Sequence, residues 1–207
     1  LFRSPLVGAV HALVADHVVQ GRVIFPGAGY LELARAASGS SALQAVFFLQ
    51  PLALESAGSY IECSVTAGSF EIRTGSMLEI AVHCTGSFAS SGVPAGVSRM
   101  SLAALHSHVG SRVVDVGALY DAFDKVGLQY GPGYRTLEQA WGGGHNTATG
   151  RLRVRSSHQG TLVHPADLDD ALCLSALLRS SGTSETRLPF AVDLAQLQGS
   201  SARLWAA

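Results

Sequence analysis

The 207-residue sequence predicts an α+β domain. A β-branched and aromatic run followed by a proline and an amphipathic helix occurs early in the chain, and a similar unit occurs near its end. The segments between these units alternate apolar and polar residues and are separated by glycines, which is typical of antiparallel hairpins. The two similar units suggest a duplicated arrangement in which one helix packs on one sheet.

The first unit contains a buried strand at Val23–Phe25, a turn at Pro26–Gly29 and a helix from Tyr30 to about Ala37. A loop rich in serine and glycine is expected after this helix. The strands predicted beyond it are Ala45–Leu49, Tyr60–Thr66, Ser69–Thr74 and Met77–Thr85.

The second half is expected to follow a flexible linker. Small, turn-forming residues around positions 88–96 place this linker at 97–114, between subdomains 1–96 and 115–207. A helix from Val116 is predicted to end at Gly127, a suitable C-cap. The remaining predicted elements are strands at Tyr134–Trp141, Thr147–Val154, Thr161–Val163, Leu188–Leu197 and Ala202–Trp205, and a helix from Ala166 to about Leu178.

The composition indicates a globular protein with a substantial core. Hydrophobic residues make up 47% of the chain and charged residues 14%, while the net charge of −1 gives no electrostatic reason to expect nucleic acid or an anionic membrane as a partner. No apolar segment reaches the length of about 18 to 20 residues that spans a bilayer. The missing initial methionine suggests a piece of a longer protein.

The three cysteines, Cys63, Cys84 and Cys173, are far apart and odd in number, so a disulfide framework or a zinc site is not expected. This usage fits a reducing, cytoplasmic setting. No metal is expected, because the other histidines lack the spacing of metal ligands: His83, His106, His108, His145 and His158.

His17 is the first candidate for a catalytic role. Its valine and isoleucine neighbours would desolvate the imidazole and keep it neutral, as a general base must be. The backbone N–H groups at the following helix start, at Gly27, can polarise a carbonyl while the imidazole removes a proton from the adjacent carbon. Two other interpretations stay open: His17 as an ordinary buried polar residue, and Gly21 as either a close backbone approach or a simple turn.

Three segments then resemble one known family. His17, Gly21 and Pro26 form a His-x3-Gly-x4-Pro pattern that resembles the first signature of polyketide synthase dehydratase domains. The segment VHPADLDDALCL resembles the second signature, in which a His-Pro pair, here His164-Pro165, leads into a helix with the catalytic aspartate. YGPGYR, which begins at Tyr130, resembles a third family element.

The resemblance implies a double hotdog fold, in which two long helices are each wrapped by an antiparallel sheet. It implies a dehydratase that converts a 3-hydroxyacyl thioester on the phosphopantetheine of acyl carrier protein into a 2,3-enoyl thioester, with no metal or redox cofactor. Neighbouring synthase domains and a second copy in a homodimer are the other expected partners. His17 is then the base and Asp169 the acid, although a shift by one residue to Asp170 stays open.

Other residues of the expected site follow from the same resemblance. His164 and Pro165 are expected to be structural, and Asp167 to complement the helix dipole. Tyr130 is expected either to donate a hydroxyl near the pocket or to be a core aromatic residue. The tripeptide ending in Pro189-Phe190 resembles an element that lines the substrate tunnel.

Cys173 departs from the family pattern. It lies four residues after Asp169 on the same helix face, where relatives usually carry glutamine or histidine, and a thiol is a weak hydrogen-bonding group. The position is read either as a weaker orienting contact in the pocket or as a small buried core residue. Two alternative functions on the same fold therefore stay open: an isomerase or cyclase of the product-template type, and a catalytically silent scaffold domain.

Overall fold

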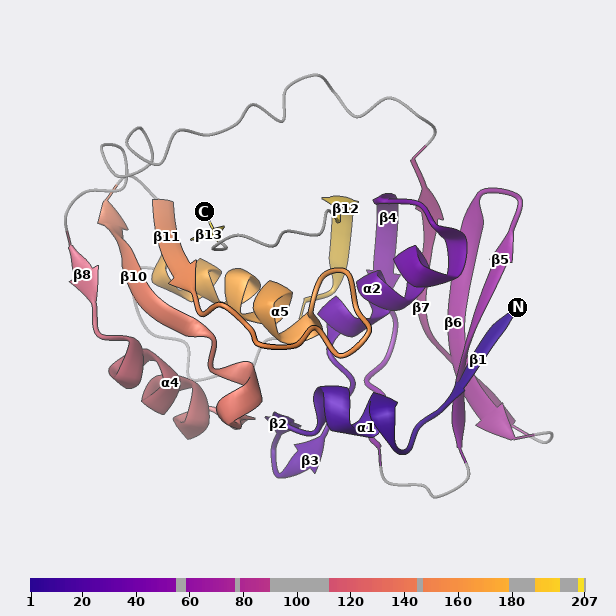
Figure 1. The fold of residues 1–207 in the computed structure, drawn as a ribbon, viewed down its shortest axis with the longest axis horizontal. Coiled ribbons are helices and arrows are strands. Elements are labelled where there is room, and N and C mark those ends of the chain that lie inside the picture. The colour runs from indigo at the N-terminus through magenta and orange to yellow at the C-terminus, as the bar shows by residue number, and fades with distance from the viewer. Residues whose placement is uncertain are drawn as a thin grey trace.

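A computed structural model describes residues 1–54, 59–76, 79–89, 112–144, 147–178, 189–197 and 205–206. Two helices, α2 (Gly27–Ser38) and α5 (Pro165–Cys173), contact each other in the middle of the molecule, between two groups of antiparallel strands (Figure 1). Helix α2 packs in one hydrophobic core and α5 contributes to a second, and each core contains residues from both halves of the chain. The α+β class expected from the sequence is therefore confirmed.

The larger sheet has six strands in the order β1-β5-β6-β7-β4-β12. Its last strand comes from the C-terminal half of the chain but pairs with β4, as the yellow arrow beside β4 in Figure 1 shows. The two halves therefore share this sheet. The strands are β1 (Phe2–Pro5), β4 (Ala42–Phe48), β5 (Tyr60–Thr66), β6 (Ser69–Ser76), β7 (Glu79–Phe88) and β12 (Ala191–Gln196).

The second sheet has four strands in the order β13-β11-β10-β8. Helix α4 (Val116–Lys125) follows β8 in the chain and is capped by Asp115, whose carboxylate accepts the Ala118 N–H at 3.1 Å. The short 3₁₀-helix η2 (Leu174–Leu178) continues α5. The strands are β8 (Val113–Val114), β10 (Leu137–Gly144), β11 (Thr147–Leu152) and β13 (Trp205–Ala206).

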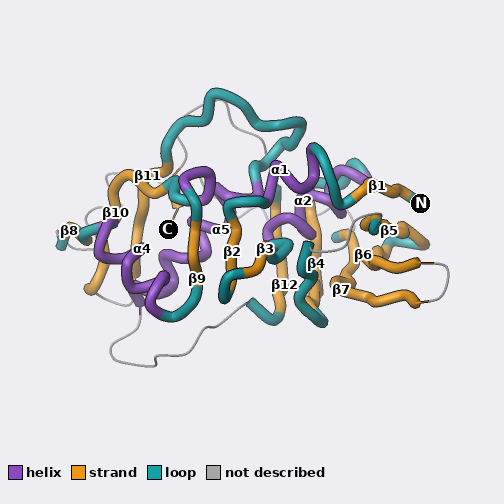
Figure 2. Tube along the Cα trace, turned by 90° about the horizontal axis from the view of Figure 1, so that it is seen from below, coloured by secondary structure: helices purple, strands orange, loops and turns teal. Residues whose placement is uncertain are grey.

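A third, small sheet joins the two halves. Strand β2 (His17–Val19) pairs with β3 (Arg22–Val23) on one side and with β9 (Leu128–Tyr130) on the other, and Figure 2 shows the three strands side by side. His17 lies directly opposite Tyr130 in this register. The sheet therefore brings the first signature of the sequence next to the YGPGYR segment.

The β2–β3 connection explains Gly21. Gln20 and Gly21 both have positive φ, 50° and 78°, which is the requirement of the tight type I′ hairpin turn. A Cβ added to Gly21 would meet no atom within 4 Å. Gly21 therefore serves the turn, and the alternative of a close backbone approach is wrong.

Several elements differ from the sequence-based expectations. Helix α2 begins at Gly27 rather than Tyr30, because Pro26 adopts extended angles (φ −72°, ψ 151°) and serves as the N-cap. Residues 161–163 form a loop, so the predicted strand there is wrong. Helix α1 (Ala9–Val14), β1, β2 and β9 were not predicted.

Other predicted elements agree with the structure, and one falls mainly on residues that the structure does not describe. Strand β5 has the predicted bounds, and α4 ends close to Gly127, which has the positive φ of 87° expected after a helix end. Residues 97–111 of the predicted linker lie outside the described residues, and Val113–Val114 at its end form β8. Among the described helices, none has the length and apolar character needed to cross a bilayer.

Candidate active site

The β2–β3 hairpin fixes the orientation of the His17 ring. His17 Nδ1 lies 2.7 Å from the carbonyl oxygen of Ile24, and the Ile24 N–H donates to the carbonyl of His17 at 3.1 Å. Because a carbonyl oxygen only accepts, the neutral imidazole carries its proton on Nδ1 and keeps a lone pair on Nε2. The structure thus leaves Nε2 as the basic atom.

Asp169 faces that basic atom from the other half of the chain. Its Oδ2 lies 3.7 Å from His17 Nε2, and the two side chains are only 12% and 4% exposed. Burial raises the pKa of the Asp169 carboxyl, an effect that the His17 ring and hydrogen bonding from Tyr130 partly offset. Oδ2 accepts no hydrogen bond from the described residues, so this carboxyl is suited to hold a proton and donate it.

Two tyrosines surround the imidazole. The ring centroids of Tyr130 and Tyr134 lie 5.5 Å and 5.3 Å from that of His17. Burial raises the pKa of both phenols, so they stay neutral. Tyr134 was not among the expected site residues, although it is the second tyrosine of the YGPGYR segment.

Cys173 lies next to Tyr130 in the candidate site. Its Sγ lies 3.5 Å from the hydroxyl of Tyr130, one helical turn after Asp169. Burial raises the pKa of the Cys173 thiol well above its usual value, so the thiol stays protonated. A neutral thiol can offer Tyr130 only a weak hydrogen bond.

Asp170 has a different environment from Asp169. Its carboxylate accepts hydrogen bonds from the Tyr120 hydroxyl at 3.0 Å, from the Thr136 hydroxyl at 2.6 Å and from the Thr136 N–H. Burial raises the pKa of Asp170 to about 6. Of the two carboxylates that the sequence left open, the structure brings Asp169 to His17 and anchors Asp170 on Tyr120 and Thr136.

His164 and Pro165 form the N-terminus of α5. His164 is the N-cap: its Nδ1 accepts the Ala166 N–H at 3.2 Å, while Nε2 donates to Gln159 Oε1 at 2.8 Å. Burial lowers the pKa of His164 to about 4, which suits a neutral capping group. Pro165 occupies the first helical position, where its missing N–H costs no hydrogen bond.

Glu32 connects α2 to the segment that enters α5. Its carboxylate accepts the Leu162 N–H at 2.7 Å and the Val163 N–H at 3.4 Å, and it also pairs with Arg35 at 2.7 Å. These contacts explain why residues 161–163 do not form the predicted strand. Nothing in the local sequence pattern around Glu32 indicates a partner about 130 residues away.

The start of α2 is closely packed. A Cβ on Gly27 would lie 3.2 Å from Phe48 Cζ and 3.3 Å from Pro189 Cγ, so Pro189 lies next to this helix terminus. The N-cap residue, Pro26, accepts no hydrogen bond from the N-terminal N–H groups of α2 through its side chain. Phe190, by contrast, is 70% exposed, and its ring contacts Phe47 at a centroid distance of 6.4 Å, so the structure does not bring its ring to His17 and Asp169.

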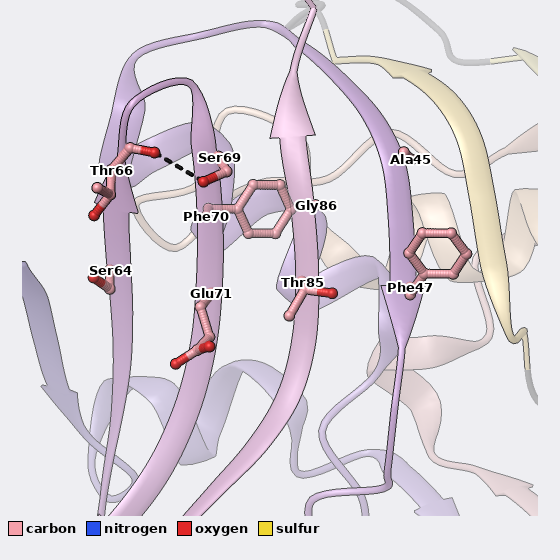
Figure 3. Close-up of a pocket in the computed structure, with 9 residues that line it drawn as sticks. All are labelled: Ala45, Phe47, Ser64, Thr66, Ser69, Phe70, Glu71, Thr85 and Gly86. Carbon is pink, nitrogen blue, oxygen red and sulfur yellow. Dashed lines mark hydrogen bonds between the residues drawn. The ribbon is translucent and has the colours of Figure 1, made fainter.

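A separate hollow of about 480 Å³ lies on the six-stranded sheet, with Phe47, Ser64, Glu71 and Thr85 at its surface (Figure 3). None of the expected site residues lines it. The described part of the chain also contains no group of three or more His, Cys, Asp or Glu side chains placed to hold a metal ion. The lining residues of the hollow are Ala45, Phe47, Ser64, Thr66, Ser69, Phe70, Glu71, Thr85 and Gly86.

Family models cover most of the chain. The model described as "Polyketide synthase dehydratase domain" matches residues 1–82, and the one described as "Polyketide synthase dehydratase N-terminal domain" matches residues 100–207. Polyketide synthase ThaG of Burkholderia thailandensis is 34% identical over 176 residues, and PksN of Bacillus subtilis is 28% identical over 216 residues. These matches take in 77% and 93% of this chain, which spans only 3% and 4% of the two large relatives.

Solved structures agree with the family match. The dehydratase domain from the CurF module of curacin polyketide synthase superposes with a TM-score of 0.82 at 21% identity, over 99% of this chain and 80% of that one. A trans-AT polyketide synthase dehydratase domain from Brevibacillus brevis gives a TM-score of 0.82 at 22% identity, over 98% of this chain and 78% of that one. The expected double hotdog fold is thereby confirmed, and the chain belongs to the family of polyketide synthase dehydratase domains.

Proposed function

We propose that this domain removes water from a 3-hydroxyacyl thioester to give the 2,3-enoyl thioester, with His17 as base and Asp169 as acid. The observation that carries the proposal is the buried pair itself: a basic Nε2 and an under-partnered carboxyl, 3.7 Å apart, from opposite halves of the chain. A base and an acid held together away from water suit an elimination, in which one proton is removed and another is delivered.

The reaction balances with these two groups alone. His17 Nε2 takes the proton from the carbon next to the thioester carbonyl, while Asp169 donates its proton to the hydroxyl on the next carbon. The C–O bond breaks, the C=C bond forms and water leaves. The pair is left as imidazolium and carboxylate, and a proton transfer from His17 to Asp169 restores the starting state.

The start of α2 supports the same step. Gly27 is the first residue of that helix, and the N–H of a first helical residue has no partner within the helix. In the proposal this N–H binds the thioester oxygen and stabilises the negative charge that develops on it. Pro189 and Phe48 pack against Gly27 and thus flank the position of the thioester.

Tyr130 and Cys173 have supporting roles in this proposal. Tyr130 is a neutral donor whose hydroxyl lies next to Cys173 and interacts with the carboxyl of Asp169. It helps to orient that carboxyl, while the thiol contributes a weak contact only. The site therefore depends mainly on one tyrosine for the orientation of its acid.

The expected partners follow from the substrate. The thioester itself acidifies the carbon that loses the proton, so the proposed reaction requires no metal or redox cofactor. We propose acyl carrier protein as the carrier of the substrate, adjoining synthase domains as neighbours, and a homodimer in the cytoplasm. The small share of each relative that the chain spans supports a place within a large multidomain synthase.

The test is turnover of a 3-hydroxyacyl pantetheine thioester, followed by mass spectrometry of the product. Wild type should form the enoyl thioester, and His17→Ala should reduce kcat about 10²- to 10⁴-fold, the usual contribution of a general base. A cyclic or double-bond-shifted product would favour an isomerase or cyclase. Absence of turnover in the folded wild type would favour a silent scaffold domain.

A further inference from the structure

The backbone of the turn Gly131-Pro132-Gly133 is hydrogen-bonded both at its N–H groups and at its carbonyl groups. It connects Tyr130 to Tyr134, the two rings that surround His17. We propose that Asp16, which accepts the N–H groups of this turn, and Arg155, which donates to one of its carbonyl groups, are positioning residues that set the separation of His17 and Asp169. The inference rests on the function proposed above.

Asp16 binds the turn from the side of His17. Its carbonyl oxygen accepts the Gly131 N–H at 2.8 Å, and its carboxylate Oδ2 accepts the Gly133 N–H at 2.6 Å. A Cβ on Gly131 or Gly133 would collide with the Asp16 side chain, the latter at 2.7 Å from Oδ2. The two glycines are therefore needed for the approach of Asp16, which immediately precedes His17 in the chain.

Two arginines bind the carbonyl groups of the turn. Arg153 donates to the Pro132 carbonyl at 3.1 Å, and Arg155 donates to the Gly133 carbonyl at 2.9 Å. The Nε of Arg155 also pairs with Asp167 Oδ1 at 2.6 Å, and both of these side chains are almost fully buried. Asp167 lies in the first turn of α5, two residues before Asp169.

These contacts form a continuous bridge from Asp16, through the turn and Arg155, to Asp167. One end is Asp16, the residue before the proposed base, and the other is Asp167, in the first turn of the helix that carries the proposed acid. Buried charge-assisted hydrogen bonds of this kind are stronger and more geometrically defined than neutral ones. Loss of either charged group should therefore loosen the Tyr130–Tyr134 segment and misalign the His17–Asp169 pair.

Hydrogen exchange of the purified domain tests the bridge without the need for turnover. Asp16→Ala and Arg155→Ala should each speed exchange of the Tyr130–Arg135 amides about tenfold or more, since a charge-assisted bond to this turn is lost. Arg151→Ala is the matched control, because Arg151 lies on β11, four residues before Arg155, and pairs with the exposed Glu138. Unchanged exchange in the folded Asp16→Ala and Arg155→Ala variants would overturn the inference.

Steady-state kinetics then test whether Asp16 acts by positioning the turn or through its negative charge. Asp16→Ala should lower kcat about 10- to 100-fold with KM changed less than about threefold, whereas Asp16→Asn, whose amide oxygen still accepts the Gly133 N–H, should stay within about threefold of wild type. If Asn fails as badly as Ala and the pH profile shifts, Asp16 acts through its charge on His17 and the inference is wrong.

A double mutant completes the test. Because Asp16 and Arg155 act on one turn, the combined variant should lose much less activity than the product of the two single losses. Fully multiplicative losses would contradict a shared bridge. If wild type is active and the Asp16→Ala and Arg155→Ala variants are equally active, the dehydratase proposal is unaffected and only the positioning role is wrong. If wild type is inactive, the dehydratase proposal is wrong, and the hydrogen-exchange rates alone test whether Asp16 and Arg155 hold the turn.

Discussion

Asp169 and Asp170 are neighbours on α5, yet their surroundings differ in a way that separates chemistry from structure. Both are buried, and burial raises the pKa of both carboxyls. Asp170 receives three hydrogen bonds from Tyr120 and Thr136, whereas Asp169 Oδ2 receives none from the described residues and faces His17. A buried acid with few partners can exchange its proton, while a buried acid with many partners holds the fold together.

The largest expected consequence of the difference between Asp169 and Asp170 is on the pH dependence of activity. Because burial raises the pKa of Asp169 and the proposed mechanism needs its protonated form, kcat/KM should fall as pH rises through that pKa, approaching about tenfold per pH unit. The measurement is the rate of enoyl thioester formation across a pH series. A kcat/KM that rises steadily with pH over the whole range would argue against Asp169 as the acid.

Removal of Asp170 should mainly affect stability. Asp170→Ala leaves the Thr136 N–H, the Thr136 hydroxyl and the Tyr120 hydroxyl without their acceptor in a buried site, which should cost about 3 kcal/mol of unfolding free energy and lower Tm by roughly 6 to 12 °C. Thermal and urea denaturation measure both quantities. A loss below about 1 kcal/mol would show that the three hydrogen bonds do not anchor the helix.

Asp170 should also make stability depend on pH. Its folded pKa of about 6 lies above the ordinary value of 3.8, so protonation favours the folded state. The contribution is fully present below pH 3.8 and is lost as pH rises through about 6. Urea denaturation of wild type and Asp170→Asn at a series of pH values should show a steeper loss of stability with rising pH in wild type, and parallel curves would contradict this.

Tyr130→Phe, which removes a hydroxyl near Asp169, should have a smaller effect on activity. The ring that packs beside His17 remains, but the hydroxyl next to Cys173 and Asp169 is lost. We expect kcat to fall about 5- to 10-fold, the cost of about one hydrogen bond, with little change in Tm. Steady-state kinetics with the same thioester measure this. An unchanged kcat would mean that Tyr130 is only a core aromatic residue.

Cys173→Ala should have the smallest effect. A neutral thiol is a weak partner for Tyr130, so kcat should change less than about threefold, and loss of a small buried side chain should cost about 1 kcal/mol of stability. Kinetics and urea denaturation of the same sample give both numbers. A change in the product, rather than in the rate, would instead make Cys173 a determinant of the reaction outcome.

Much of this contrast could be predicted from the sequence. The resemblance of the segment after His164-Pro165 to the family's second signature indicated Asp169, the β-branched neighbours of His17 indicated a desolvated ring, and the structure brings the two together. The sequence could not exclude Asp170 as the acid, because the partner that occupies its carboxylate, Thr136, lies 34 residues away and only the fold shows that contact.

Other features of the site could not be predicted because they depend on contacts between distant segments. Strand β9 has only three residues, too few for a periodic pattern, and it forms because β2 pairs with it. Asp16 and Glu32 bind backbone amides that are more than 100 residues away. The start of α2 was placed three residues late because glycines usually indicate turns, whereas here Pro26 caps a helix that begins with them.

The most direct test of the central claim compares Asp169→Asn with Asp170→Asn at equal concentrations of folded protein. Asparagine keeps the size of each side chain but cannot release a proton. Single-turnover conversion of a 3-hydroxyacyl pantetheine thioester should be lost by about 10²-fold or more in Asp169→Asn and stay within about tenfold of wild type in Asp170→Asn. Activity that survives in the first variant, or disappears equally in both, would contradict the assignment of Asp169 as the acid.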